Sequence, residues 1–227
     1  MNARHIIFMA AAAAILCTAP RPAAAQAVVV TAKVAFDPSI SGTMHGAATG
    51  VVNGSTLVIP EQSWTDTHST NSPLFIGGVD VPMGQKASAV GYVEYGRAGA
   101  DTITIGTANG SDVRAEFDAY KYWGLEGGIR GGGRTGVYGV ATIGFRHVSD
   151  IPVATSLQGL LKSPFYQASD VLTYGFGAGY MFGTIGIEVA AKYAGALTAA
   201  ENAPRTFQEA ASDGARWSLP ISLVLRF

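Results

Sequence analysis

The stretch RHVSD, residues 146–150, holds the pair of side chains best suited to nucleophilic chemistry. His147 and Ser149 are two residues apart, so both point to the same face if this stretch is a β-strand. A histidine in such a pair needs a carboxylate to orient it. Asp150 is adjacent and Asp170 begins the next predicted strand, but neither clearly fits that role in the sequence. The competing interpretation is an interfacial histidine and a serine that begins a loop.

Other residue types that hold metals or cofactors do not form a pattern. His45 and His68 lie in one Ser/Thr-rich stretch without metal-ligand spacing, so we expect both to be solvated. Cys17 is the single cysteine, and it lies in the N-terminal leader described below. The glycines of GGIRGGG belong to a predicted strand and its turn, and no phosphate-binding loop is present. We therefore expect no metal and no cofactor.

Charged residues inside apolar segments form the second group that could do chemistry. In seven period-2 runs the charges fall almost entirely on the face opposite the apolar side chains. In a membrane barrel a cation facing lipid at the midplane costs about 2–4 kcal/mol, which gives this sorting a physical cause. The predicted inward-facing set is Lys33, Asp80, Glu94, Glu126, Arg130, Arg146, Glu188, Lys192 and Arg226.

These charges predict an ionic network in a narrow lumen. Eight strands enclose a space just wide enough for side chains to fill, and buried charges must be paired and hydrogen-bonded to be tolerated. Five cations against four anions is close to balance. We expect a packed ionic plug; the functional alternative is a narrow proton or ion path.

Eight runs with period-2 alternation would position these side chains. They span residues 27–36, 74–81, 87–97, 119–131, 137–149, 171–183, 184–195 and 215–227. Most are close to the 9–11 residues that a tilted strand needs to cross a bilayer. The connections alternate between tight turns and long segments at about 37–73, 98–118, 150–170 and 196–214, as in barrels with short periplasmic turns and long external loops.

Two of the long segments carry hairpin signals of their own. Asn109-Gly110 lies between alternating stretches and predicts that the third and fourth strands continue beyond the membrane. VVNGSTLVI, within 37–73, forms either a small separate hairpin or part of the barrel. The limits of the first two strands depend on that choice.

Composition and the N-terminus favour a membrane barrel made after secretion. The 227 residues are 48% hydrophobic and only 14% charged. After the N-terminal region, however, no apolar stretch is as long as a transmembrane helix requires. Residues 1–25 read as a signal peptide cleaved after Ala25 or Ala27, which leaves 26–227 as the barrel with its loops. Without Arg4 and Arg21, 13 Lys and Arg remain against 16 Asp and Glu, which does not suggest nucleic-acid binding.

The predicted fold is therefore all-β: an eight-stranded antiparallel up-and-down transmembrane barrel. A soluble β-sandwich or lipocalin-like barrel would have polar outward faces and apolar inward faces. Here the larger, more aromatic face is apolar and the ions lie on the other face. Aromatic residues at the strand ends are typical of interface girdles.

YWGLEGGIR, VYGVATIGFRHVSDI, YGFGAGYMFG and RWSLPISLVLRF resemble the later strands of small outer-membrane barrels of Gram-negative bacteria. These are the OmpA-type transmembrane domain, OmpX, the opacity proteins and the porin family. The resemblance implies an outer-membrane location with both termini periplasmic, and no full OmpA-type C-terminal domain is expected. It also implies that the barrel-assembly machinery reads Leu223, Leu225 and Phe227. Pro220 departs from an ideal strand because it removes a ladder donor.

The His-x-Ser pair resembles that of lipid A deacylases of the PagL type. This resemblance implies that His147 is the base and Ser149 the nucleophile of a hydrolase acting on lipid A. That family has a glutamate a short way downstream on the next strand, whereas no glutamate occurs here between Glu126 and Glu188.

The predicted function is structural or interactive: envelope integrity, adhesion or binding through the external loops. A narrow porin-like channel and the lipid A hydrolase are the two alternatives, and the main prediction is a protein that is not an enzyme. Expected partners are outer-membrane lipid and lipopolysaccharide, the barrel-assembly machinery, and an extracellular ligand or host surface.

Overall fold

The computed structural model describes residues 28–36, 40–45, 48–52, 54–60, 62–66, 73–98, 101–155, 166–198 and 215–227. The barrel strands are β1 (Val29–Phe36), β6 (Leu74–Pro82), β7 (Ala87–Ala98), β10 (Tyr120–Gly132), β11 (Gly136–Val148), β13 (Ser169–Met181), β14 (Ile185–Ala194) and β16 (Ile221–Arg226). The strands outside it are β2 (Ile40–His45), β3 (Ala48–Val52), β4 (Ser55–Ile59), β5 (Gln62–Asp66), β8 (Asp101–Ala108), β9 (Ser111–Phe117), β12 (Val153–Thr155) and β15 (Ala215–Ser218). Within this part of the chain, no helix is long and apolar enough to cross a membrane.

Eight of the described strands form a closed antiparallel ring. Each pairs with its neighbour along the chain, and β16 pairs with β1 to complete the circle. Following the cross-strand partners of Val34 in the two directions around the ring leads to His147 and to Val137 on β11, ten residues apart. With about 3.4 Å per residue and about 4.8 Å between strands, a shear of ten residues tilts the strands by about 40°.

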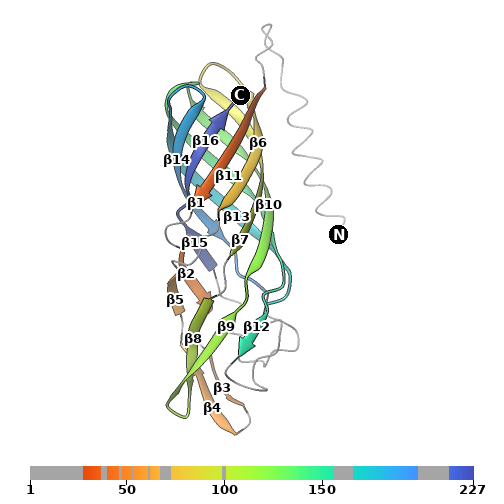
Figure 1. The fold of residues 1–227 in the computed structure, drawn as a ribbon, viewed down its shortest axis with the longest axis vertical. Coiled ribbons are helices and arrows are strands. Elements are labelled where there is room, and N and C mark those ends of the chain that lie inside the picture. Colours follow the sequence, from red (N-terminus) through yellow and green to blue (C-terminus); the bar gives the residue numbers. More distant parts are fainter. Residues whose placement is uncertain are drawn as a thin grey trace.

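The predicted eight-stranded barrel is confirmed. Each of the eight predicted ranges overlaps an observed barrel strand, and the last range contains β15 as well as β16. The short turns join β6 to β7, β10 to β11 and β13 to β14 at one end of the barrel. The start of β1 and the end of β16 lie at that same end (Figure 1), where Val30 and Phe227 exchange two backbone hydrogen bonds.

A second sheet of five strands extends from the opposite end of the barrel, in the order β12-β9-β8-β4-β3 (Figure 1). Strands β8 and β9 prolong β7 and β10, as Asn109-Gly110 predicts. Both residues have positive φ, 49° and 77°, the geometry of a two-residue type I′ turn. VVNGSTLVI forms the separate hairpin β3–β4, which pairs with β8 and not with the barrel.

The segment 37–73, expected to be mainly a polar loop, contains β2 and β5 besides that hairpin. Strand β2 pairs with β15 and β5 pairs with β2, so they continue the barrel sheet beyond its ring. Alternation in ISGTMH and QSWTD is too short and too polar to be recognised as strand by its pattern alone. Their pairing depends on the neighbouring β15.

Pro220 lies at the break between β15 and β16. Toward β14 the register is continuous, and the carbonyl of Pro220 accepts a hydrogen bond from the Ala190 amide at 3.1 Å. Toward β1 and β2 the register shifts by one residue, because three residues separate Phe36 from Ile40 and only two separate Ser218 from Ile221. The missing donor of proline therefore coincides with a register shift of the bulge type.

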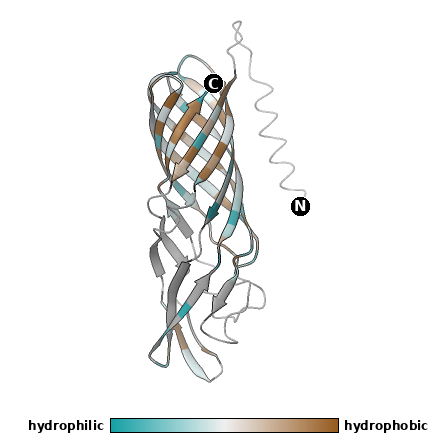
Figure 2. Cartoon of the chain, in the orientation of Figure 1, coloured by the Kyte–Doolittle hydropathy of each residue, from teal (hydrophilic) through white to brown (hydrophobic). Residues whose placement is uncertain are grey.

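The barrel wall is apolar on its outer face. Strand β13 alternates between buried and exposed residues along nearly its whole length, and β14 and β16 do the same. The exposed positions carry large apolar side chains, such as Ile129 (61% exposed), Phe176 (63%) and Leu223 (51%). Figure 2 shows these hydrophobic positions spread over the barrel strands. The alternate positions face the lumen, where the charged residues lie.

Candidate functional site

The nine charged residues expected in the lumen all lie inside the barrel wall. Eight of them are buried at the level of the whole residue, and the side chain of Arg146 is 13% exposed. They come from seven strands of the ring, at positions that alternate with outward-facing apolar residues. The closed ring therefore brings together residues as distant in sequence as Lys33 and Arg226.

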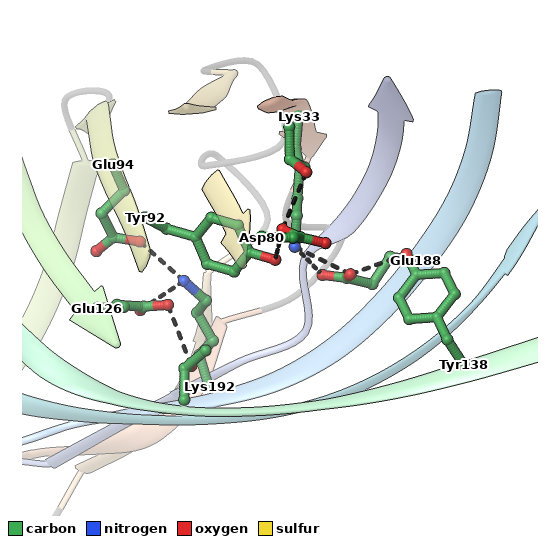
Figure 3. A network of polar contacts seen from close by, with 10 residues as sticks. Lys33, Asp80, Tyr92, Glu94, Glu126, Tyr138, Glu188 and Lys192 are labelled. Atoms are coloured by element: carbon green, nitrogen blue, oxygen red, sulfur yellow. Dashed lines mark hydrogen bonds and ion pairs between the residues drawn. The ribbon is translucent and has the colours of Figure 1, made fainter. Parts of the chain in front are cut away.

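Lys192 is the centre of one cluster in this network. Its Nζ lies 2.8 Å from Oε2 of Glu94 and 2.7 Å from Oε1 of Glu126, so one ammonium bridges two carboxylates (Figure 3). The second oxygen of Glu94 accepts a 2.7 Å hydrogen bond from Nε of Arg146. The second oxygen of Glu126 accepts one from the Thr142 hydroxyl at 3.1 Å. Each carboxylate thus has two partners, as buried charges require.

A second cluster joins Lys33 to Glu188. The Lys33 ammonium lies 2.8 and 2.9 Å from the two carboxylate oxygens, and the Tyr138 hydroxyl donates to the same carboxylate at 2.9 Å (Figure 3).

A third cluster surrounds Asp80. It receives Nη2 of Arg226 at 2.7 Å, the Thr31 hydroxyl at 3.1 Å and the Tyr92 hydroxyl at 3.4 Å. Tyr92 lies between the second and third clusters, because its ring also carries the Lys33 ammonium 4.3 Å from the ring centroid. The second and third clusters are therefore connected through Tyr92.

Three inward-facing tyrosines of the barrel strands contact cations of the lumen. Each carries a lumen cation over its ring, at 4.0 to 4.5 Å from the centroid: Lys33 over Tyr92, Arg146 over Tyr122 and Arg130 over Tyr138. Each also lies directly opposite a glycine of the next strand: Gly78, Gly96 and Gly179 respectively. A Cβ on any of these glycines would collide with the ring opposite it. The glycines thus make space for tyrosines that hold the cations.

The tyrosines and two threonines are members of the network that the sequence-based prediction did not include. A signal was present: Tyr122 has the same parity as Glu126, and Tyr138 has the same parity as Arg146. Parity places a residue on the inner face, but it does not show which cation will lie over which ring. That pairing depends on the shear of the barrel.

A small cavity remains between the Lys192 and Lys33 clusters. Its volume is about 20 Å³, and both lysines, Glu126 and Glu188 contribute to its lining. This is room for about one water molecule with polar partners on several sides. At the end with the short turns, Tyr138, Met181 and Val224 form a buried cluster.

His147 and Ser149 lie at the other end of the barrel. His147 points outward beside Trp123, with ring centroids 5.6 Å apart. Its Nδ1 lies 2.8 Å from Oδ1 of Asp170 on β13, so Asp170 occupies the orienting position that the sequence did not clearly assign. The Ser149 hydroxyl has other partners: it accepts from the Lys121 amide at 3.1 Å and donates to the Asp150 carbonyl at 3.3 Å. The structure brings the histidine and a carboxylate together, but not the histidine and the serine.

The remaining predicted residues are placed as follows. Leu223 and Phe227 point outward, with Phe227 72% exposed, and Leu225 shares their face. The side chain of His45, all of His68 and the predicted signal peptide lie outside the described residues. Among the described residues, no group of three or more His, Cys, Asp or Glu is arranged to hold a metal ion.

Known protein structures include barrels of similar architecture. Ail, the attachment invasion locus protein of Yersinia pestis, matches 88% of this chain and 98% of its own, with 12% identity and a TM-score of 0.47. A structure of Ail with the heparin analogue sucrose octasulfate gives 10% identity and a TM-score of 0.44. The N-terminal β-barrel domain of OprF from Pseudomonas aeruginosa gives 12% identity over 87% of this chain and 97% of its own, with a TM-score of 0.42. No family model and no curated protein matches the sequence. The predicted fold of a small eight-stranded barrel is confirmed by the strand pairing of the closed ring.

Proposed function

We propose that this protein is an outer-membrane β-barrel of a Gram-negative bacterium with a structural or surface-interaction role. The observation that carries the proposal is the inverted distribution of side chains. Large apolar residues on the ring strands are about half exposed on the outer face, and the charged residues are buried inside. A soluble protein rarely exposes a contiguous apolar surface of more than a few hundred Å². A bilayer would cover this surface.

The lengths of the connections support an orientation with the short turns in the periplasm. Short turns at one end and an extended sheet at the other are typical of barrels whose turns face the periplasm. The end of β16 lies on the turn side, which supports periplasmic termini. The sheet β12-β9-β8-β4-β3 would then project from the cell and present the surface available to a ligand or a host surface.

A closed lumen fits this role better than a channel. The buried carboxylates are each paired, and the cavity between the two lysine clusters has a volume of only about 20 Å³. Moving an ion through the lumen would require breaking buried ion pairs, and breaking one costs about 3–5 kcal/mol. The assembly role of Leu223, Leu225 and Phe227 stays a prediction.

Three measurements test the main proposal. A folded barrel in the outer-membrane fraction should change its gel mobility on heating, and extraction as a soluble periplasmic protein would overturn the proposal. The purified barrel should give no steady conductance in a planar bilayer; stable single-channel steps would support the channel instead. The interaction role predicts that binding to a surface ligand moves with segment 37–73 when it is grafted onto another barrel.

The contact between His147 and Asp170 favours one second candidate, a hydrolase acting on an ester of a membrane lipid. The 2.8 Å contact at Nδ1 would hold the ring with Nε2 free to act as base. Ser149 would have to exchange its contact with the Lys121 amide for one with His147. The test is fatty acid released from lipopolysaccharide. Release that is lost in Ser149→Ala and reduced in Asp170→Asn, but kept in Asp150→Asn, would establish this activity; no release by the native protein would exclude it.

A further inference from the structure

Two cations face each other on the outside of the barrel, at the end that carries the extension. Arg97 on β7 and Lys121 on β10 are direct cross-strand partners. Both side chains are exposed, and both lie on the face that carries Tyr95 and Trp123 two residues closer to the barrel centre. The two cations are therefore on the outer wall and not in the lumen.

Within the described residues, nothing compensates the charges of this pair. Like charges directly opposite each other on neighbouring strands destabilise a sheet. In the described part of the chain, no ion pair joins Arg97 or Lys121 to a carboxylate. In the lumen, by contrast, each cation has a carboxylate or an aromatic ring as partner. An external anion would relieve the repulsion between the two outer cations.

The neighbouring residues show at what depth that anion would lie. Tyr95 and Trp123 are cross-strand partners, and both are half exposed. The ring of Trp123 also packs against Phe145 on the next strand, with ring centroids 5.6 Å apart. Aromatic side chains of this kind line the membrane interface of barrels. Arg97 and Lys121 lie one step beyond them, at the level of lipid headgroups.

Asp170, which lies level with Trp123 and His147 across neighbouring strands, does not neutralise the pair. Asp170 lies two strands away from β10, across β11, and contacts His147 at 2.8 Å. On the near side of Lys121, the Ser149 amide donates to the Lys121 carbonyl at 2.9 Å. The exposed Asp150, which follows Ser149, accepts a 2.6 Å hydrogen bond from the Ala168 amide, and in the described part of the chain no ion pair joins it to Arg97 or Lys121.

We propose that Arg97 and Lys121 together bind the phosphate of a membrane-lipid headgroup, with Tyr95 and Trp123 against the upper part of its acyl chains. The inference rests on the proposed membrane location of the barrel. An arginine and a lysine supply several donors around one phosphate, which also satisfies two charges that otherwise repel each other. Attachment of the acyl chains to the same molecule places that phosphate at the height of the two cations, which a free ion would not do.

The experiment uses the folded full-length barrel in non-ionic detergent micelles, titrated with bisphosphorylated lipid A and followed by native mass spectrometry. A cation near an anionic lipid surface contributes about 1 kcal/mol. Arg97→Gln or Lys121→Gln should each therefore weaken binding about five-fold, and the double variant about thirty-fold. The matched control is Lys86→Gln with Arg134→Gln, which removes two exposed cations from the short turns at the opposite end. The control should change binding less than two-fold.

Equal loss of binding in the two double variants would overturn the site, because it would show an effect of total charge alone. Binding of inorganic phosphate as tight as that of lipid A would overturn the assignment to a lipid. Heat-modifiable gel mobility is measured on every variant. A failure of the membrane proposal would appear as loss of heat-modifiability in the native protein, whereas a failure of this inference would leave it intact and change only lipid binding.

Discussion

At the residue scale, the lumen depends on a few side chains that serve more than one partner. Lys192 is the clearest example, because its ammonium is shared by Glu94 and Glu126. Removal of one partner of a buried ion pair leaves an uncompensated charge, which costs more than the pair itself contributes. The geometry of this site therefore predicts strong and specific coupling between the three residues.

Lys192→Met should lower the free energy of unfolding by about 3–5 kcal/mol, because two buried carboxylates lose their shared cation. The measurement is the urea midpoint of refolding into detergent micelles, followed by gel mobility. Lys86→Met, in an exposed turn, is the control and should leave the midpoint unchanged. The double variant Lys192→Met/Glu126→Gln should recover much of the loss, since Glu94 retains Arg146. Additive losses in that cycle would contradict the network.

The glycines opposite the tyrosines make a second prediction at this scale. A Cβ at Gly78 would collide with the Gly91 carbonyl and the Tyr92 ring, whereas the adjacent Gly77 has open space. Gly78→Ala should destabilise the barrel by about 1–3 kcal/mol through overpacking. Gly77→Ala should be neutral or slightly stabilising, because alanine restricts the unfolded chain. Equal urea midpoints for the two variants would refute the proposed tyrosine–glycine packing.

At the element scale, the eight barrel strands could be predicted because each is long and alternates between an apolar and a mixed face. Strand β14, for example, places Ile185, Ile187 and Val189 on one face and Glu188 on the other. Alternation does not determine the shear, so the partner of a given charge could not be predicted. The alternation of β14 places Glu188 inside the barrel. Only the register of β14 with β16, and of β16 with β1, places it against Lys33.

The elements that escaped prediction are short. Strands β2, β5 and β12 have six, five and three residues and depend on pairing with β15, β2 and β9. The carboxylate beside His147 escaped for a related reason. His147 and Asp170 are 23 residues apart, and the register between β11 and β13 makes them direct neighbours. Distance along the chain gives no information about that register when a long connection lies between the strands.

The turn between β8 and β9 makes a prediction about one element. Gly110 has φ of 77°, a conformation that costs a residue with a side chain about 1–2 kcal/mol. Gly110→Val should therefore raise hydrogen exchange within 101–117 and leave exchange in β10 and β11 unchanged. Gly84→Ala, in a turn where an added Cβ has open space, is the control. Faster exchange throughout the barrel would show that the extension and the ring unfold together.

At the scale of the whole molecule, the barrel and the extended sheet are built on different principles. The ring is closed, so each of its strands has two neighbours and no edge remains. Its interior is filled by paired charges and tyrosines, and its exterior is apolar. The five-stranded sheet is open and ends at β3 and β12. This division suggests that the ring provides insertion and stability, and that the extension provides the surface for recognition.

Replacement of residues 99–118 by a two-residue turn tests that division. The change removes β8 and β9, to which β4 and β12 are paired, but it removes no cross-strand partner within the ring. The lumen ion pairs of Lys33, Lys192 and Arg226 also remain. We therefore expect unchanged heat-modifiable mobility and a urea midpoint close to that of the native protein, together with loss of any surface binding that the extension mediates. A shortened protein that fails to fold would show instead that the extension stabilises the barrel, and the matched Gly84→Ala variant would confirm that the preparation itself supports folding.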